Sequence, residues 1–90
     1  MFENFISLKK RVGQNGSVIR FKDFVLVSVF KTGPRGEWFE AEAWSPIETE
    51  DEADVDFFHL RLENVTEWYG ARFNTEGEAL FAAMQAVEAF

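Results

Sequence analysis

The apolar positions of the first twelve residues recur at the spacing of one face of an α-helix. These positions are Phe2, Phe5, Ile6, Leu8 and Val12. Three cations follow at residues 9–11, in what would be the last helical turn, where positive charge favours the helix dipole. Gly13 is a typical residue at which a helix ends. The pattern predicts a short amphipathic helix over residues 2–12.

Between residues 17 and 44 the apolar positions change to the period of two that is typical of β-strands. Lys22 and Asp23 interrupt this alternation, which indicates either a tight hairpin turn or a β-bulge. The segment FVLVSVF, residues 24–30, is apolar on both faces and predicts a central strand that is covered on both sides. Glycine and proline in TGPRGE, residues 32–37, predict a hairpin turn into a return strand over residues 37–44.

The second half of the chain predicts two further strands and a helix. VDFFHLRLENV, residues 55–65, alternates as a strand with Phe58, Leu60 and Leu62 on its inward face, and EWYGARF, residues 67–73, predicts one more short strand. Thr75 and Glu78 have the spacing of a capping box, which indicates the start of a helix. The apolar stripe expected on this helix is Ala79, Leu80, Ala83, Met84, Val87 and Phe90.

These elements predict an α+β fold in which residues 1–90 form a single domain. We expect an antiparallel sheet of four to five strands, flanked by an N-terminal and a C-terminal helix. The core residues expected to be buried together are Phe24, Leu26, Phe58, Leu60, Leu80 and Val87. The last stretch, FNTEGEALFAAMQAVEAF, resembles the strand-to-helix joint of many small α+β modules, HicB-like antitoxins among them. That resemblance implies a fold and no function.

Composition adds that this is an ordered domain without thiol chemistry. Hydrophobic residues make up 47% of the chain and aromatic residues 17%, which argues against disorder. With no cysteine there is no disulfide framework and no thiolate ligand or nucleophile. No apolar run approaches the roughly 20 residues of a membrane helix, and the N-terminus lacks the pattern of a signal peptide. We therefore expect a cytoplasmic protein that does not contact a membrane.

Charge is distributed unevenly along the chain. Residues 1–36 carry seven bases and two acids, whereas residues 37–90 carry fourteen acids and two bases, so that +5 and −12 give the net charge of −7. Such asymmetry indicates either two faces that meet within one fold or one face that is reserved for a partner. The cations of KKRVGQNGSVIRFK, residues 9–22, suggest nucleic-acid binding only weakly, because the acidic remainder would repel phosphate.

The most acidic stretch is ETEDEADVDFF, residues 48–58, in which six carboxylates occupy nine positions. Glu52, Asp54, Asp56 and Glu63 have the spacing of ligand positions 1, 3, 5 and 12 of an EF-hand loop. Phe57 stands where that loop needs glycine, and the flanking segments predict strands rather than helices. We therefore assign no metal site and interpret the run as a solvated loop whose charge extends a binding face.

No residue pattern predicts catalysis. His59 is the only histidine, and no serine has a base and an orienting partner at a recognisable spacing. Paired carboxylates need a desolvated cleft to separate their pKa values, and nucleotide-binding motifs are absent from the sequence. We therefore predict a protein that is not an enzyme and needs no cofactor.

The remaining hypothesis is a small acidic protein-binding module. Trp38, Glu40, Glu42 and Trp44 share one face of the strand at residues 37–44, and both tryptophans are expected on an outer surface. Carboxylates two residues apart on a strand lie roughly 6.7 Å apart, a spacing similar to that of successive phosphates. The partner-binding residues predicted are Trp38, Glu40, Glu42, Trp44, Glu48, Glu50, Asp51, Glu52, Asp54 and Asp56.

The expected partner is a protein with a basic, nucleic-acid-binding surface, which this face would occupy as a nucleic-acid mimic. One concrete version is an inhibitor of the kind that phage use in counter-defence, similar in size and charge to anti-CRISPR proteins. The alternative is a self-associating structural or regulatory subunit that forms a homodimer through exposed aromatic residues.

Overall fold

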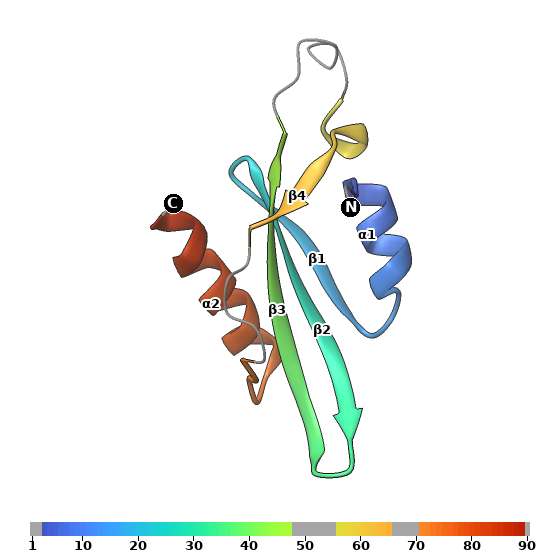
Figure 1. Ribbon diagram of the computed structural model, residues 1–90, viewed down its shortest axis with the longest axis vertical. Coiled ribbons are helices and arrows are strands. Elements are labelled where there is room, and N and C mark those ends of the chain that lie inside the picture. The colour runs from blue at the N-terminus through green and yellow to red at the C-terminus, as the bar shows by residue number, and fades with distance from the viewer. Residues whose placement is uncertain (1–2, 48–55, 66–70, 90) are drawn as a thin grey trace.

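The computed structural model describes residues 3–47, 56–65 and 71–89. It is a single α+β domain in which an antiparallel sheet lies between two helices, one against each face (Figure 1). The sheet has the strand order β1-β2-β3-β4, so each strand pairs with the next along the chain. The predicted fold class is confirmed. The elements are α1 (Phe5–Val12), β1 (Gly16–Phe21), β2 (Phe24–Gly33), β3 (Gly36–Pro46), the 3₁₀ helix η2 (Phe57–His59), β4 (Leu62–Asn64) and α2 (Glu76–Glu88).

Helix α1 begins at Phe5 because Asn4 and Ser7 form a capping box. The Asn4 side chain accepts a hydrogen bond from the Ser7 backbone N–H at 2.8 Å, and the Ser7 hydroxyl accepts one from the Asn4 N–H at 2.9 Å. The helix ends at Gly13, which has a positive φ of 57°. The helix is therefore shorter at its start than the predicted range of 2–12, and Phe2 lies outside the described residues.

Two tight hairpins build the first three strands. Phe21 pairs with Phe24, so Lys22 and Asp23 form a two-residue turn, and Lys22 adopts a positive φ of 55°. The choice between turn and bulge is thereby settled in favour of the turn. Gly33 pairs with Gly36 at the second hairpin, where Gly36 has a φ of 122° that only glycine adopts easily. This hairpin extends beyond both helices (Figure 1).

Strand β2 is buried on both of its faces, as the apolar residues on both faces of FVLVSVF predict. On the α1 side, one cluster contains Leu8, Val12, Val18, Val25, Val27, Val29, Trp44 and Leu62. On the α2 side, a second cluster contains Leu26, Ala41, Ala43, Ala79, Ala83 and Val87, with Phe24, Leu80 and Met84 packed against it. Of the predicted core, Phe24, Leu26, Leu80 and Val87 are therefore brought together.

The predicted strand over residues 55–65 is wrong in its first half. Residues 57–59 form the 3₁₀ helix η2, and only Leu62–Asn64 form a strand, β4. The Asp56 side chain accepts a hydrogen bond from the Phe58 N–H at 2.9 Å, and this local bond competes with extended pairing. As a result Phe58 is 52% exposed, and Leu60 is half-buried beside a hollow that it shares with Phe57 and Pro46.

The described part of the predicted strand over residues 67–73 forms only an isolated bridge. Phe73 and Phe39 exchange two backbone hydrogen bonds of 2.8 and 2.9 Å, and residues 66–70 lie outside the described ranges. The predicted cap of α2 is present, since the Thr75 hydroxyl accepts a hydrogen bond from the Glu78 N–H at 3.1 Å. The Glu78 carboxylate accepts in turn from the Asn74 N–H, one residue before the expected partner.

Ser28 provides a test of the packing on the α2 side. Its hydroxyl is fully buried and has no hydrogen-bond partner among the described residues. We expect Ser28→Ala to raise the free energy of unfolding by about 1 kcal/mol, because it removes a buried polar group that is not satisfied. Urea denaturation of the variant and the wild type measures the difference. A loss of stability of similar size would show that the hydroxyl has a partner.

Candidate protein-binding surface

The four predicted residues of β3 lie on one face of the sheet. Trp38, Glu40, Glu42 and Trp44 pair in register with Lys31, Val29, Val27 and Val25, respectively. The three valines belong to the cluster on the α1 side, and Trp44 lies in the same cluster. The predicted shared face is confirmed. The four residues nevertheless differ in what covers them and in what their side chains contact.

Trp44 belongs to the core. Its side chain is 6% exposed and packs in the cluster beneath α1, while its indole Nε1 donates a hydrogen bond to Glu42 Oε1 at 2.8 Å. The expectation that both tryptophans lie on an outer surface is therefore wrong for Trp44. The physical reason is that Trp44 packs in one cluster with Leu8 and Val12 of α1, and the alternation of a strand does not reveal where along its length such cover lies.

Glu42 connects the sheet to α1. Its Oε1 lies 2.7 Å from Arg11 Nη2, and its Oε2 lies 3.4 Å from Arg11 Nη1, so the contact is bidentate. Arg11 Nε also lies 3.4 Å from Glu3 Oε2. The hydrogen bond to Glu42, followed by the charges of Glu42 and Glu3, raises the pKa of Arg11, against the opposing effect of burial. The charge of Glu42 is therefore neutralised within the fold.

Trp38 contacts both a carboxylate and an arginine. Its Nε1 donates a hydrogen bond to Glu40 Oε2 at 2.9 Å, and the guanidinium carbon of Arg72 lies 4.0 Å from its ring centroid. Arg35 and Arg72 line a hollow of about 160 Å³ with Trp38 at the β2–β3 hairpin. Trp38, Glu40 and Glu42 are half-buried, whereas Trp44 is buried, and Trp38 lies next to Arg35 and Arg72.

The acidic run is attached at the opposite end of β3 from that hairpin. The run follows Ile47, just past the end of β3 at Pro46, and ends at Asp56, just before η2. Residues 48–55 lie outside the described ranges, and with them Glu48, Glu50, Asp51, Glu52 and Asp54. In the ranges that are described, no group of three potential metal ligands comes together.

Asp56 is the one member of the run that the structure describes. Its carboxylate accepts the Phe58 N–H and also contacts His59 Nδ1 at 2.9 and 3.0 Å. The hydrogen bond to His59 is the main cause that lowers the pKa of Asp56. Both side chains are well exposed, and the contact closes the turn of η2.

The net charge of the protein is concentrated in the run. The described residues contain ten acids and nine bases, so the body of the domain is close to neutral. The remaining six acids are Glu67 and the five between residues 48 and 54, and no base lies among these undescribed residues. The excess negative charge therefore belongs almost entirely to one short segment.

Sequence reasoning missed an aromatic patch that directly follows the run. Phe5, Phe57 and Phe58 contact one another with ring centroids 5.3–6.1 Å apart, and Ile6 on α1 is 49% exposed. The guanidinium carbon of Arg20 lies 3.8 Å from the centroid of the Phe57 ring. The adjacent letters FF at the end of the acidic run were a signal for this patch, but the strand interpretation placed one of the two rings inside.

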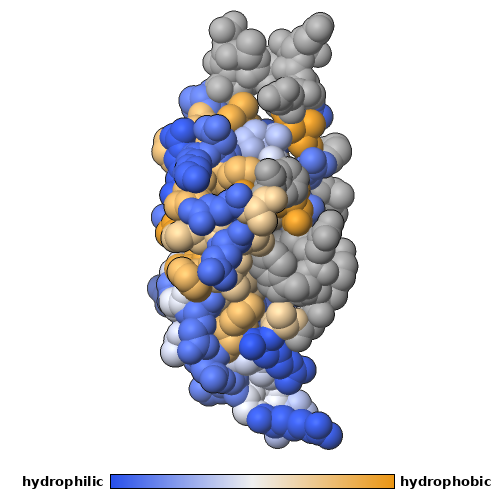
Figure 2. Space-filling view, turned by 90° about the vertical axis from the view of Figure 1, so that its left-hand side faces the viewer, coloured by the Kyte–Doolittle hydropathy of each residue, from blue (hydrophilic) through white to orange (hydrophobic). Residues whose placement is uncertain are grey.

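The surface of α2 is mixed in character. Figure 2 views the molecule from the side of this helix and shows apolar residues interspersed with hydrophilic ones. Phe81 is 57% exposed there. Neither described helix has the length and apolar character that crossing a bilayer requires. Comparisons with protein-family models, curated protein sequences and solved structures give no match to this chain.

Proposed function

We propose that the protein is a non-catalytic binding module that docks an acidic surface on a basic, nucleic-acid-binding protein partner. The acidic run at residues 48–56 is the element that meets the partner. The sequence also predicted Glu42 and Trp44 as partner-binding residues, but both instead hold α1 against the sheet. The version we propose is an inhibitor or regulator that occupies a basic groove of a nucleic-acid-processing or defence complex, similar in size and charge to phage counter-defence proteins.

The observation that carries this proposal is the charge balance of the molecule. Because ten acids offset nine bases in the described body, the field around the protein originates mainly from the five acids between residues 48 and 54. Charge that is concentrated in this way orients a molecule during encounter and increases its association rate with an oppositely charged groove. An acidic composition that served only solubility would not need to collect its excess in one segment.

The aromatic patch of Phe5, Phe57 and Phe58 supplies an apolar contact surface, which charge alone does not provide. Phe58 follows Asp56 by two residues and is exposed, with Ile6 exposed on the adjacent helix. Large aromatic groups that lose water on contact dominate binding energy, whereas rim charges act mainly on encounter. We therefore assign the anchoring contact to Phe58, in place of Trp44, which lies in the core.

A second candidate function is self-association through the same exposed aromatic residues. Phe58 and Phe81 are both more than half exposed, and exposed rings are enriched at interfaces. A homodimer would depend on protein concentration and would persist without the acidic run. The absence of cysteine is compatible with the cytoplasm, where we place either form.

Two variants of equal net charge test the proposal. The first replaces Glu48, Glu50 and Glu52 by glutamine and Asp54 by asparagine, and the control replaces Glu37, Glu63 and Glu88 by glutamine and Asp23 by asparagine. The control positions are all exposed. Each tagged protein is incubated with cell lysate, and the retained proteins are identified by mass spectrometry.

We expect wild type and control to retain the same basic protein and the run variant to lose it, because the charge of the run, not the total charge, makes the contact. Equal retention by all three proteins, or equal loss in both variants, would contradict the proposal. Sedimentation of the purified wild type and both variants at increasing concentration tests the self-association candidate. If that candidate is right, all three proteins form dimers.

A further inference from the structure

In the part of the chain that the structure describes, no strand pairs with the outer edge of β1. Strand order places β1 at the end of the sheet, with β2 as its partner on one side only. Pairing across the two-residue turn makes Phe21–Phe24, Ile19–Leu26 and Ser17–Ser28 the hydrogen-bonded pairs of this hairpin. The Phe30 N–H donates to the Asn15 carbonyl, which continues the same alternation.

The alternation determines which backbone groups point outward. Gly16, Val18 and Arg20 occupy the non-hydrogen-bonded positions opposite β2, so their N–H and C=O groups are directed at the outer edge. Among residues 3–47, 56–65 and 71–89, no backbone group is bonded to them there. An exposed edge of this kind is a template for an additional strand.

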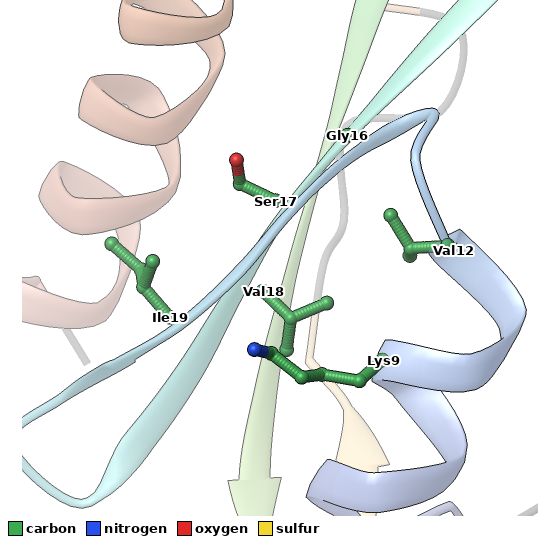
Figure 3. Close-up of a pocket in the computed structure, with 7 residues that line it drawn as sticks. Lys9, Val12, Gly16, Ser17, Val18 and Ile19 are labelled. Atoms are coloured by element: carbon green, nitrogen blue, oxygen red, sulfur yellow. The ribbon is translucent and has the colours of Figure 1, made fainter.

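Helix α1 forms a wall beside this edge. Lys9, Val12 and Gly13 of α1 and the adjacent turn, together with residues 16–19 of β1, line a hollow of about 270 Å³. Figure 3 shows Lys9 and Val12 on the helix side of the hollow with Val18 facing them, whereas Ser17 and Ile19 project from the opposite side of the strand. A strand added to β1 would direct every second side chain into this hollow.

Cations outnumber carboxylates around the edge, where Asp23 lies in the turn and Glu76 accepts a hydrogen bond from the Ser17 hydroxyl on the opposite face of the sheet. Lys9 lies in the hollow, Arg20 projects on the same face of the sheet, and Lys22 follows in the turn. None of the three has an ion pair with a carboxylate in the described part of the chain. Arg20 Nε donates only to the Lys22 carbonyl, at 3.2 Å.

We propose that the edge of β1, with the wall of α1, binds an extended acidic segment of a partner protein by strand addition. The outward groups of Gly16, Val18 and Arg20 supply the backbone hydrogen bonds. The hollow between Val12 and Val18 accepts apolar side chains, and Lys9 and Arg20 pair with acidic ones. This site is distinct from the acidic run and selects the opposite charge.

The same charges disfavour a second copy of this chain as the occupant. A two-fold pair of β1 strands keeps both α1 helices on one face of the joined sheet, close to the junction. Lys9 and Arg20 of one copy would then lie near their equivalents in the other, and like charges across a pair of strands are destabilising. An acidic segment, in contrast, is attracted by Lys9 and Arg20.

The probe for this site is a blocked nonapeptide in which every second residue, the set that would face α1, is alternately glutamate and valine, with threonine at the positions between them. Titrated into ¹⁵N-labelled protein, it should shift the amide resonances of residues 16–20 with a saturable curve and slow the hydrogen exchange of the Val18 and Arg20 N–H groups. The same peptide with lysine in place of glutamate should give little shift, because it meets Lys9 and Arg20 with like charge. Shifts that stay absent from β1, or equal shifts with both peptides, would overturn the proposal.

Matched variants locate the contact. Lys9→Glu should weaken binding by about five- to tenfold, whereas Lys10→Glu, which alters net charge equally but does not line the hollow, should change it by less than about twofold. Arg20→Pro and Arg20→Ala both remove the guanidinium and its contacts with Phe57 and the Lys22 carbonyl, but only the proline variant also loses the outward N–H, so it should bind more weakly. Equal effects of the two lysine variants would overturn the site. Protection of the same amides that rises with protein concentration, without peptide, would assign the edge to a second copy instead.

Discussion

Replacing Trp44 by alanine is expected to lower the free energy of unfolding by about 3–5 kcal/mol. The indole is almost completely buried between α1 and the sheet, and its Nε1 bonds to the carboxylate that also pairs with Arg11. Removal leaves a large cavity and one hydrogen bond fewer at Glu42. The matched change Trp38→Ala, on the same strand face, should cost less than about 2 kcal/mol because that side chain is half-exposed.

Chemical denaturation monitored by far-ultraviolet circular dichroism gives both values. The comparison is informative because the two residues are of one type, on one strand and on one face, and differ mainly in the cover that α1 provides. Equal and small effects would show that α1 does not pack over Trp44. The tryptophan of this end of β3 would then be available to a partner.

The second large effect is expected in the segment around β4. Leu62→Ala should cost about 2–5 kcal/mol, since Leu62 has no exposed surface and lies in the cluster on the α1 side. Phe58→Ala should cost less than about 1.5 kcal/mol, the order of an exposed contact between aromatic rings. A strand over the whole of residues 55–65 would instead place both side chains inward.

The same denaturation experiment separates the two arrangements. If Phe58→Ala destabilises the protein as strongly as Leu62→Ala, then Phe58 is buried, and the aromatic patch proposed as an anchoring contact does not exist. A folded Phe58→Ala variant also tests Phe58 as the anchoring contact. It should associate with the basic partner at the wild-type rate but dissociate from it faster than wild type does.

Sequence reasoning succeeded where the signal is local. The second hairpin follows from glycine and proline at residues 33–36, and the cap of α2 follows from Thr75 and Glu78. Lys22-Asp23 located the first connection but left a choice between turn and bulge. The two-sided burial of β2 follows from the apolar residues on both of its faces. Each of these features depends on residues that are close in sequence, so pattern and propensity determine them.

The errors arose where two signals compete or where a distant element decides. In residues 55–65 the alternation favoured a strand, but the carboxylate of Asp56 caps a turn of 3₁₀ helix and exposes Phe58. On β3 the alternation gave the correct face, yet a cluster with Leu8 and Val12 of α1 covers Trp44 and does not include Trp38. No pattern within one strand contains that information.

The acids of the second half of the chain fall into two groups: those paired within the fold and those of the acidic run. Arg11 from the basic half pairs with Glu42 from the acidic half, so the two halves do meet within the fold. The acids at residues 48–54 exceed what the described cations balance. Of the two interpretations of the asymmetry, internal pairing thus applies to β3, and the proposal of a partner rests on the run.

The association rate with the retained basic partner tests this central claim most directly. It is measured by surface plasmon resonance over a series of salt concentrations for wild type, for the four-residue run variant and for the control variant of equal net charge. We predict that the run variant associates about tenfold or more slowly at low salt, with a flatter salt dependence, while the control stays within about twofold of wild type. Equal rates for the two variants would contradict the account, because total charge rather than the acidic run would then govern encounter.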